Sequence, residues 1–393
     1  MPKVYCDRIA ATPLLPEVRE AMRPYLEGAF GNPQSLHAAG REAQEAVEGA
    51  RAQVAALVGA RPDEIYFAAS GSEANNFALK GLALGQQSKG RHLVVSAVEH
   101  SSVLNSVKAL ERLGFTSSLV PVDRAGLVDP VDVAKALTEE TTVVSVMTAN
   151  SEVGTIQPVA EIAAVCRERG VLFHTDAVAA AGSVALDVKA LGVDALSLAG
   201  DQFYGPKGSA ALFVRKGVRV LPLVDGGIQE GGRRGGTENV PAIAGLGAAA
   251  RLAARDMAAR SAALIPLRDR LLEGLPERIE RVVVTGPRTG RLPHHASFCV
   301  EFVEGEGMLL FLDMKGIAVS SGSACTSKSL KASHVLLAMG YDHALAQGSL
   351  VFSLVDGTTA ADVDYILETF PPIVDRLRKM SPLYTAFLKE RGS

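Results

Sequence analysis

The chain has 393 residues, of which 48% are hydrophobic, and a formal net charge of −3. This length predicts two domains with a sizeable core, and the charge gives no reason to expect nucleic acid or an anionic membrane as a partner. No apolar run approaches the roughly 20 residues of a membrane-spanning helix, and the four cysteines show no CxxC spacing. We therefore expect a soluble, cytoplasmic protein without a disulfide framework or a self-contained zinc site.

Strands and helices are expected to alternate through the first half of the chain. Apolar runs typical of strands are 65–68, 92–96, 117–122, 142–147, 171–175 and 195–198. Helical segments between most of these runs indicate βαβ units and a largely parallel sheet. Ligands of such sheets lie at the carboxyl ends of the strands, so the polar residues that follow these runs are the candidate site.

Three of these strand ends carry candidate residues, and a fourth site is a helix start. His100, Asn150 and Asp176 follow expected strands, and Gly71 and Ser72 open an expected helix. Free N–H groups at a helix start, with the helix dipole behind them, favour an anion. The alternatives are structural: an ordinary N-cap serine, a histidine that only packs, and an aspartate that caps a turn.

Gly-rich segments form a second set of motifs. Residues 199–208 read Ala-Gly-Asp-Gln-Phe-Tyr-Gly-Pro-Lys-Gly between two apolar runs, and residues 226–239 contain Thr237. Residues 320–325 read Ser-Ser-Gly-Ser-Ala-Cys. Small neighbours favour an exposed, reactive thiol at Cys325, whereas Cys166 and Cys299 are expected to be buried and inert.

Together these motifs resemble those of cysteine desulfurases of the NifS/IscS kind, which are pyridoxal-phosphate enzymes of the class V aminotransferase family. The resemblance covers essentially the whole chain and implies the fold type I α/β architecture, with a mainly parallel, seven-stranded sheet in the large domain and a small α+β domain. The implied boundaries are 1–14 for an N-terminal segment packing on the small domain, 15–255 for the large domain and 256–393 for the small domain. A homodimer with its sites at the interface is also implied.

The resemblance assigns cofactor contacts to the matching residues. The phosphate is held at the turn of Ser72 and is reached by Thr237 of the partner subunit. His100 stacks on the pyridine ring, Asn150 contacts the 3′-oxygen, and Asp176 pairs with the pyridinium nitrogen. The cofactor-binding residues implied are Gly71, Ser72, His100, Asn150, Asp176 and Thr237.

Five positions depart from the family pattern. Gln202 replaces the Schiff-base lysine, and an amide nitrogen can neither form the imine nor act as a general base. Val351 replaces the arginine that clamps the substrate carboxylate, so the charge-assisted fork is absent. The other three replace polar residues near the cofactor: Ala179, Ala199 and Asp201. The implied cofactor is therefore pyridoxal phosphate without an internal aldimine, or none.

Because the Cys325 motif is intact, the first interpretation is a degenerate desulfurase homologue in iron–sulfur cluster assembly or sulfur transfer. Cys325, the expected catalytic residue, would carry a persulfide or ligate a transient iron–sulfur cluster, with a scaffold protein or a sulfur acceptor as partner. One alternative is an active desulfurase that converts L-cysteine to L-alanine and persulfide with non-covalent pyridoxal phosphate. It would be slow, since general-base assistance is typically worth roughly 10²–10⁴-fold. A cofactor-free regulatory or scaffold subunit is the other alternative.

Overall fold

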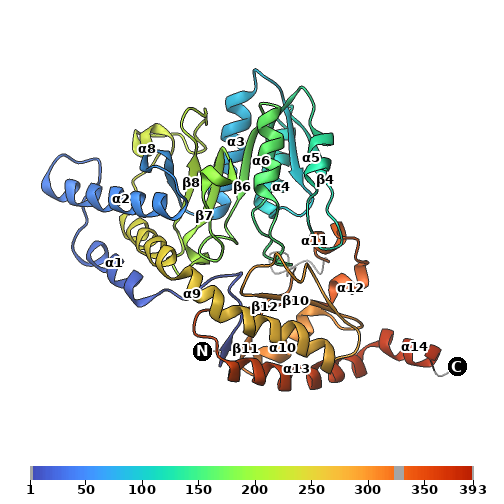
Figure 1. Ribbon diagram of the computed structural model, residues 1–393. Coiled ribbons are helices and arrows are strands. Elements are labelled where there is room, and N and C mark those ends of the chain that lie inside the picture. Colours follow the sequence, from blue (N-terminus) through green and yellow to red (C-terminus); the bar gives the residue numbers. More distant parts are fainter. Residues whose placement is uncertain (1–2, 323–331, 392–393) are drawn as a thin grey trace.

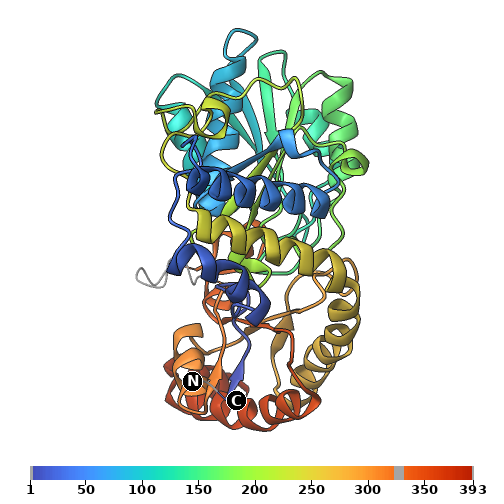
Figure 2. The ribbon, with the colours of Figure 1, turned by 90° about the vertical axis from the view of Figure 1, so that its left-hand side faces the viewer.

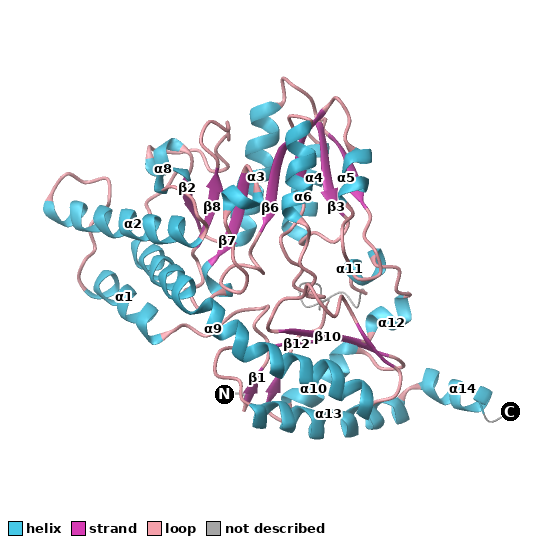
Figure 3. Cartoon of the chain, viewed as in Figure 1, coloured by secondary structure: helices cyan, strands magenta, loops and turns pink. Residues whose placement is uncertain are grey.

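The computed structural model describes residues 3–322 and 332–391 (Figure 1). A seven-stranded sheet forms the upper part of the molecule in this view, and a three-stranded sheet lies below it (Figure 3). The long helix α9 (Val240–Arg278) passes from the upper part to the lower one (Figure 2).

The upper sheet has the strand order β2-β8-β7-β6-β5-β3-β4. Only β8 runs antiparallel to its neighbours, so the predicted mainly parallel, seven-stranded sheet is confirmed. Its strands are β2 (Ile65–Ala68), β3 (His92–Ser96), β4 (Thr116–Val120), β5 (Thr141–Ser145), β6 (Leu172–Asp176), β7 (Ala195–Ala199) and β8 (Ala210–Val214). Every residue of β3, β5, β7 and β8 is buried, because helices cover both faces of the sheet.

The two faces of this sheet carry separate hydrophobic clusters. Leu93 and Val94 are neighbours in β3 but belong to different clusters, since side chains alternate along a strand. Helices α2, α6 and α9 contribute to one cluster, and α3 and α4 contribute to the other. The helices before α9 are α1 (Pro16–Glu27), α2 (Ala38–Leu57), α3 (Gly71–Gln86), α4 (Ser101–Glu111), α5 (Pro130–Ala136), α6 (Val159–Glu168), α7 (Val188–Leu191) and α8 (Gln229–Gly232), with 3₁₀ turns η1 (Pro62–Glu64) and η2 (Gly200–Gln202).

The lower part is built from the two ends of the chain. Strand β1 (Val4–Tyr5) pairs in parallel with β11 (Ile317–Ala318), and Val4 packs in the same core as Phe298. The antiparallel sheet of this part comprises β9 (Val282–Val284), β10 (His295–Val300) and β12 (Ser349–Ser353). Its helices are α10 (Gly305–Asp313), α11 (His334–Ala338), α12 (His343–Gln347), α13 (Ala360–Met380) and α14 (Pro382–Arg391). The domain boundaries at 14/15 and 255/256 stay a prediction.

The expected elements differ from the observed ones mainly at their ends. The sequence also predicts strands at 296–302 and 317–320, in the second half of the chain. The first is observed at His295–Val300, and Phe302 has a φ of 68°, which turns the chain away from extended geometry. The second contains only Ile317–Ala318. In the described residues, no helix is sufficiently long and apolar to span a membrane.

Candidate functional site

A cavity of about 480 Å³ opens at the carboxyl ends of the parallel strands, between the upper and lower parts. It is lined by the ends of β6 and β7, the start of α3 and residues 320–322 of the lower part. Five of the six implied cofactor-binding residues line it: Gly71, Ser72, His100, Asn150 and Asp176. Four of the five departures from the family pattern line it too: Ala179, Ala199, Asp201 and Gln202.

Two predicted site residues, Thr237 and Val351, do not line this cavity, and a third lies outside the described residues. Thr237 lines a separate hollow with Ala69 and Arg234. Val351 is 1% exposed within β12 and bridges to Ser320, and it does not line the cavity. Cys325 lies outside the described residues, although Gly322 and His334 on either side of its segment line the cavity. Among the described residues, no group of three or more His, Cys, Asp or Glu side chains is placed to hold a metal ion.

Asp176 is held at the base of the cavity by two hydrogen bonds. Its Oδ2 accepts from Asn75 Nδ2 at 2.6 Å, and its Oδ1 accepts from the Val178 N–H at 2.9 Å. Burial raises the pKa of Asp176, while nearby His100 and these two hydrogen bonds oppose the rise. The carboxyl group is thus fixed in orientation inside a largely apolar wall.

Asn75 connects this carboxylate to His100. Its Nδ2 also donates to Ser102 Oγ at 2.9 Å, and Ser102 Oγ lies 2.7 Å from His100 Nδ1. The Oδ1 atom of Asn75 is buried and has no hydrogen-bond partner in the described part of the chain. Our sequence reasoning missed Asn75, although its position three residues after Ser72 places both on one helix face.

Asn150 shapes the turn after β5. Its Oδ1 accepts from the N–H groups of Glu152 at 2.8 Å and Val153 at 3.0 Å. Its Nδ2 donates to the Val98 carbonyl at 3.0 Å, and the residue is 1% exposed. The Asn150 side chain therefore connects the turn after β5 with the segment after β3. A contact with a ligand would be additional to this structural role.

Two buried carboxyl groups beside the cavity were also missed. Ser96 Oγ and the Met147 N–H both donate to Glu99 Oε1, leaving Oε2 without a partner in the described residues. Burial raises the pKa of Glu99 to about 8 and that of Glu152 to about 7. Ser333 Oγ donates to Glu152, which opposes the rise for that carboxyl.

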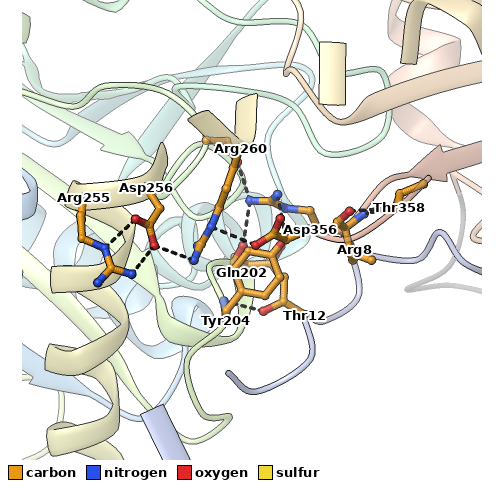
Figure 4. Close-up of polar contacts among 11 residues, drawn as sticks. Arg8, Thr12, Gln202, Tyr204, Arg255, Asp256, Arg260, Asp356 and Thr358 are labelled. Atoms are coloured by element: carbon orange, nitrogen blue, oxygen red, sulfur yellow. Dashed lines mark hydrogen bonds and ion pairs between the residues drawn. The ribbon is translucent and has the colours of Figure 1, made fainter. Parts of the chain in front are cut away.

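The turn that carries Gln202 is hydrogen-bonded to the N-terminal segment (Figure 4). Thr12 donates to the Asp201 carbonyl through both N at 2.7 Å and Oγ1 at 2.8 Å, and its Oγ1 accepts from the Tyr204 N–H at 2.6 Å. Gln202 Nε2 donates to the Ile9 carbonyl at 3.3 Å. The amide at the family's lysine position is therefore a contact to the N-terminal segment.

Arg8 lies behind this turn with its guanidinium almost fully buried. It donates to Ser183 Oγ at 2.6 Å and makes longer contacts of 3.4 Å to the Gln202 carbonyl and to Tyr204 Oη. These three partners are neutral, and burial lowers the pKa of Arg8.

Comparison with known proteins identifies the family of this architecture. The family model described as aminotransferase class-V matches residues 4–366. The chain belongs to the class V aminotransferase family. It is 47% identical to a protein named cysteine desulfurase IscS of Dictyoglomus turgidum, over 97% of this chain and 96% of that relative. A cysteine desulfurase IscS of Methanosarcina thermophila is also 47% identical, over 97% of this chain and 94% of that relative.

Solved structures of the family share the fold. A NifS-like protein superposes with a TM-score of 0.90 at 35% identity, covering 96% of this chain and all of that chain. A NifS-like protein from Rickettsia africae gives a TM-score of 0.85 at 31% identity, covering 95% of this chain and 99% of that chain. The predicted fold type I architecture is therefore confirmed.

The family's cofactor, pyridoxal phosphate, fits one half of the cavity better than the other. Asp176 is an oriented acceptor for a ring N–H, and His100 lies in the same wall. At the helix start, Ala199 lies 3.5 Å from the place a Cβ would take on Gly71 and offers only a methyl group. No lysine or arginine occurs among the described lining residues, and Asp201 adds a carboxyl group. The described lining thus suits a pyridine ring but supplies neither a phosphate-neutralising cation nor a lysine amine.

Proposed function

We propose that this chain is a desulfurase-family protein that does not remove sulfur from free cysteine, and that it serves iron–sulfur cluster assembly or sulfur transfer through Cys325. The observation that carries this proposal is the side chain of Gln202. It lines the cavity and donates from its amide to the Ile9 carbonyl at 3.3 Å. An amide nitrogen has no available lone pair, so position 202 supplies neither the nucleophile nor the general base of the family reaction.

The substrate clamp is missing as well. Val351 is buried in the lower sheet, where the family pattern has an arginine. An arginine–carboxylate fork contributes two charge-assisted hydrogen bonds, each worth roughly 1.5–3 kcal/mol. A free amino acid would find no such partner at this position, which supports a ligand other than L-cysteine.

Transfer of sulfur from a persulfide requires only the thiol of Cys325, without a Schiff-base lysine or a substrate arginine. In the proposed step, the thiolate of Cys325 attacks the terminal sulfur of a donor persulfide, the donor thiolate leaves, and Cys325 keeps the transferred sulfur as its own persulfide. The exchange is balanced without an oxidant or a reductant. The partner would be a sulfur acceptor or a scaffold protein, on which the same thiolate could instead ligate a transient cluster.

The first test is spectroscopic. Freshly purified protein is scanned before and after addition of pyridoxal phosphate, treated with borohydride and weighed intact. We expect no internal aldimine band and no cofactor fixed to one specific lysine by peptide mapping, whereas Gln202→Lys provides the control in which position 202 itself is labelled. A stoichiometric adduct on one specific lysine of the protein as purified, before cofactor is added, would show that another lysine has replaced position 202, and the proposal would fail.

The second test addresses the thiol. Wild type and Cys325→Ser are incubated with a persulfide donor and with a sulfur acceptor or scaffold, and the sulfur or cluster loaded on that acceptor is measured. We expect Cys325→Ser to abolish the loading that depends on this protein, with Cys166→Ser as a matched control at a buried cysteine. Unchanged loading by Cys325→Ser would contradict the proposal.

One observation favours a second function. The ring-facing group of Asp176, Asn75 and His100 is intact, which supports a slow desulfurase with non-covalent pyridoxal phosphate. Sulfide release from L-cysteine that depends on added pyridoxal phosphate would favour that enzyme over the sulfur carrier. A regulatory subunit, in contrast, should co-purify with an active desulfurase in a mixed dimer.

A further inference from the structure

The two ends of the cavity differ in charge. At the ring end, Asp176 is oriented by Asn75 and by the turn at Val178, and it lines the cavity while being only 5% exposed. Such an acceptor suits the N–H of a protonated nitrogen heterocycle. This end retains the chemistry to hold a pyridine-type ring.

The other end is the start of α3, a helix of 16 residues. Ser70 caps it by accepting from the Glu73 N–H at 3.1 Å, and Gly71 and Ser72 face the cavity. A helix start alone would favour an anion. Here, however, the methyl group of Ala199 lies beside the helix start, and the carboxyl group of Asp201 lines the same cavity.

The backbone of Asp201 is held in position by hydrogen bonds to the N-terminal segment. Thr12 donates twice to its carbonyl oxygen, at 2.7 and 2.8 Å. Burial raises the pKa of this half-buried carboxyl group, while its own N–H and the charge of Lys207, an exposed residue that does not line the cavity, oppose the rise. The carboxyl group of Asp201 thus lines the same cavity that an anionic arm would have to enter.

Nearby cations are engaged elsewhere. Arg234 pairs with Glu73 at 3.0 Å, and Arg8 lies behind the turn, bonded to Ser183 and outside the cavity lining. Thr237, the residue implied to come from the partner subunit, is uncharged. Along the described wall, no lysine or arginine stands between Asp201 and a bound dianion, and like charges placed together in a binding site cost several kcal/mol of affinity.

We propose that this cavity binds an unphosphorylated pyridine-type ligand and that Asp201 is the specificity-determining residue that excludes the phosphorylated form. This inference goes beyond the sulfur-carrier function, because it concerns the ligand of the cavity and is independent of Cys325. It assigns the pocket to a neutral or cationic ring, of the chemical class of the B6 vitamers that lack a phosphate.

The test uses pyridoxine and pyridoxine 5′-phosphate, a pair that differs only in the phosphate and has no aldehyde to react with surface lysines. Dissociation constants are measured by equilibrium dialysis at pH 8 on the full chain. We expect wild type to bind pyridoxine at least about tenfold more tightly than its phosphate. Asp201→Asn, which is isosteric and uncharged, should tighten binding of the phosphate at least about tenfold while changing the pyridoxine constant less than about twofold.

Two control variants separate charge from fold. Asp63→Asn removes one exposed carboxylate outside the cavity and should change neither constant. Asp176→Asn should weaken both ligands, since it removes the ring acceptor. The proposal is overturned if wild type prefers the phosphate, if Asp201→Asn leaves the ratio unchanged while melting like wild type, or if neither ligand binds. Any of these outcomes leaves the Cys325 loading test intact, so the two proposals fail separately.

Discussion

Asn75 is the side chain on which the cavity's hydrogen-bond network most directly depends. It is 1% exposed, and one amide nitrogen serves both Asp176 and Ser102. Leaving a buried carboxylate oxygen without its donor costs about 1–3 kcal/mol. We therefore expect Asn75→Ala to lower the free energy of unfolding by about 1–3 kcal/mol in urea denaturation.

Asn76 provides the matched control for this substitution. Its amide donates to the Ser72 carbonyl at the exposed side of the same helix. Asn76→Ala should cost less than about 1 kcal/mol, because water can replace its partner. Equal decreases in the free energy of unfolding of the two variants would show that the hydrogen bonds of the Asn75 side chain add nothing to stability.

Glu99 makes the stability of the protein depend on pH. Burial raises its pKa from 4.5 to about 8, so the folded chain keeps a proton that the unfolded chain loses earlier. Its contribution to stability is full below pH 4.5 and is lost as the pH rises through 8. Glu99→Gln cannot titrate, so the stability of wild type relative to this variant should fall between pH 5 and pH 8, by up to about 1.4 kcal/mol per pH unit.

Urea denaturation of both proteins across this pH range measures the difference. Glu152→Gln gives an independent comparison, because burial raises the pKa of Glu152 to about 7 and its contribution should be lost about one pH unit earlier. Parallel stability profiles of wild type and Glu99→Gln would mean that Glu99 is charged in the folded protein at neutral pH.

At the scale of elements, Tyr204 joins the turn after β7 to three other segments. Its hydroxyl accepts from the Asp356 N–H at 2.6 Å, and the guanidinium groups of Arg8 and Arg260 lie 5.3 Å and 5.0 Å from the centre of its ring (Figure 4). The residue has a φ of 69°, which a non-glycine residue adopts only when its surroundings compensate. The Tyr204 side chain thus contacts the N-terminal segment, α9 and the loop after β12 from a single turn.

Removing only the Tyr204 hydroxyl tests how much these contacts between segments contribute to the stability of the fold. Tyr204→Phe leaves the ring in place but deprives Arg8 and the Asp356 N–H of an acceptor. We expect a loss of about 1–3 kcal/mol in the free energy of unfolding, since the Arg8 side is buried. Tyr365→Phe removes an exposed hydroxyl that donates to the Lys315 carbonyl, and its loss should stay below about 1 kcal/mol. A Tyr204→Phe loss no larger than this control would contradict a joining role.

The elements that sequence reasoning predicted well are those specified by local pattern. Strand β5, which was expected at 142–147, carries β-branched residues at its first four positions, and the start of α3 was expected at Gly71 and Ser72, next to the observed N-cap Ser70. His100, Asn150 and Asp176 were found because parallel strands present their carboxyl ends at one edge. Helix α14 was missed as a separate element, although Ser381 followed by Pro382 is a typical helix start and Ser381 Oγ accepts from the Tyr384 N–H at 3.4 Å.

The missed site residues depend on tertiary contacts. Asn75 meets Asp176 across 101 residues of chain, and Arg8 meets Ser183 across 175. Glu99 finds the Met147 N–H 48 residues away. No local pattern records such pairs, because each becomes meaningful only after the sheet has placed β3, β5 and β6 side by side. The hydrogen bonds that hold the cavity's side chains in place could therefore not be predicted from the sequence, whereas several side chains that line the cavity could.

At the scale of the molecule, one side carries apolar residues that the single chain leaves uncovered. Phe30 is 90% exposed and Leu36 is 92% exposed, both in the connection between α1 and α2, and Ile228 at the start of α8 is 77% exposed. These elements lie together at one side of the molecule (Figure 1). Gln34 in the same connection donates to Glu238 at 2.9 Å, beside Thr237. Exposed apolar residues continuous with the Thr237 segment favour a second copy of this chain as the covering partner.

We therefore expect a homodimer that depends on this apolar surface. Phe30→Asp places a charge where the interface would exclude water, so its dimer dissociation constant, measured by analytical ultracentrifugation, should rise at least about tenfold. Leu310→Asp is the matched control, because Leu310 is 67% exposed on α10, away from α1 and α2 (Figure 1). It should leave the dimer unchanged. If Phe30→Asp dimerises like wild type, Phe30 is not part of the interface, and the implied reach of Thr237 into the partner's cavity loses its structural support.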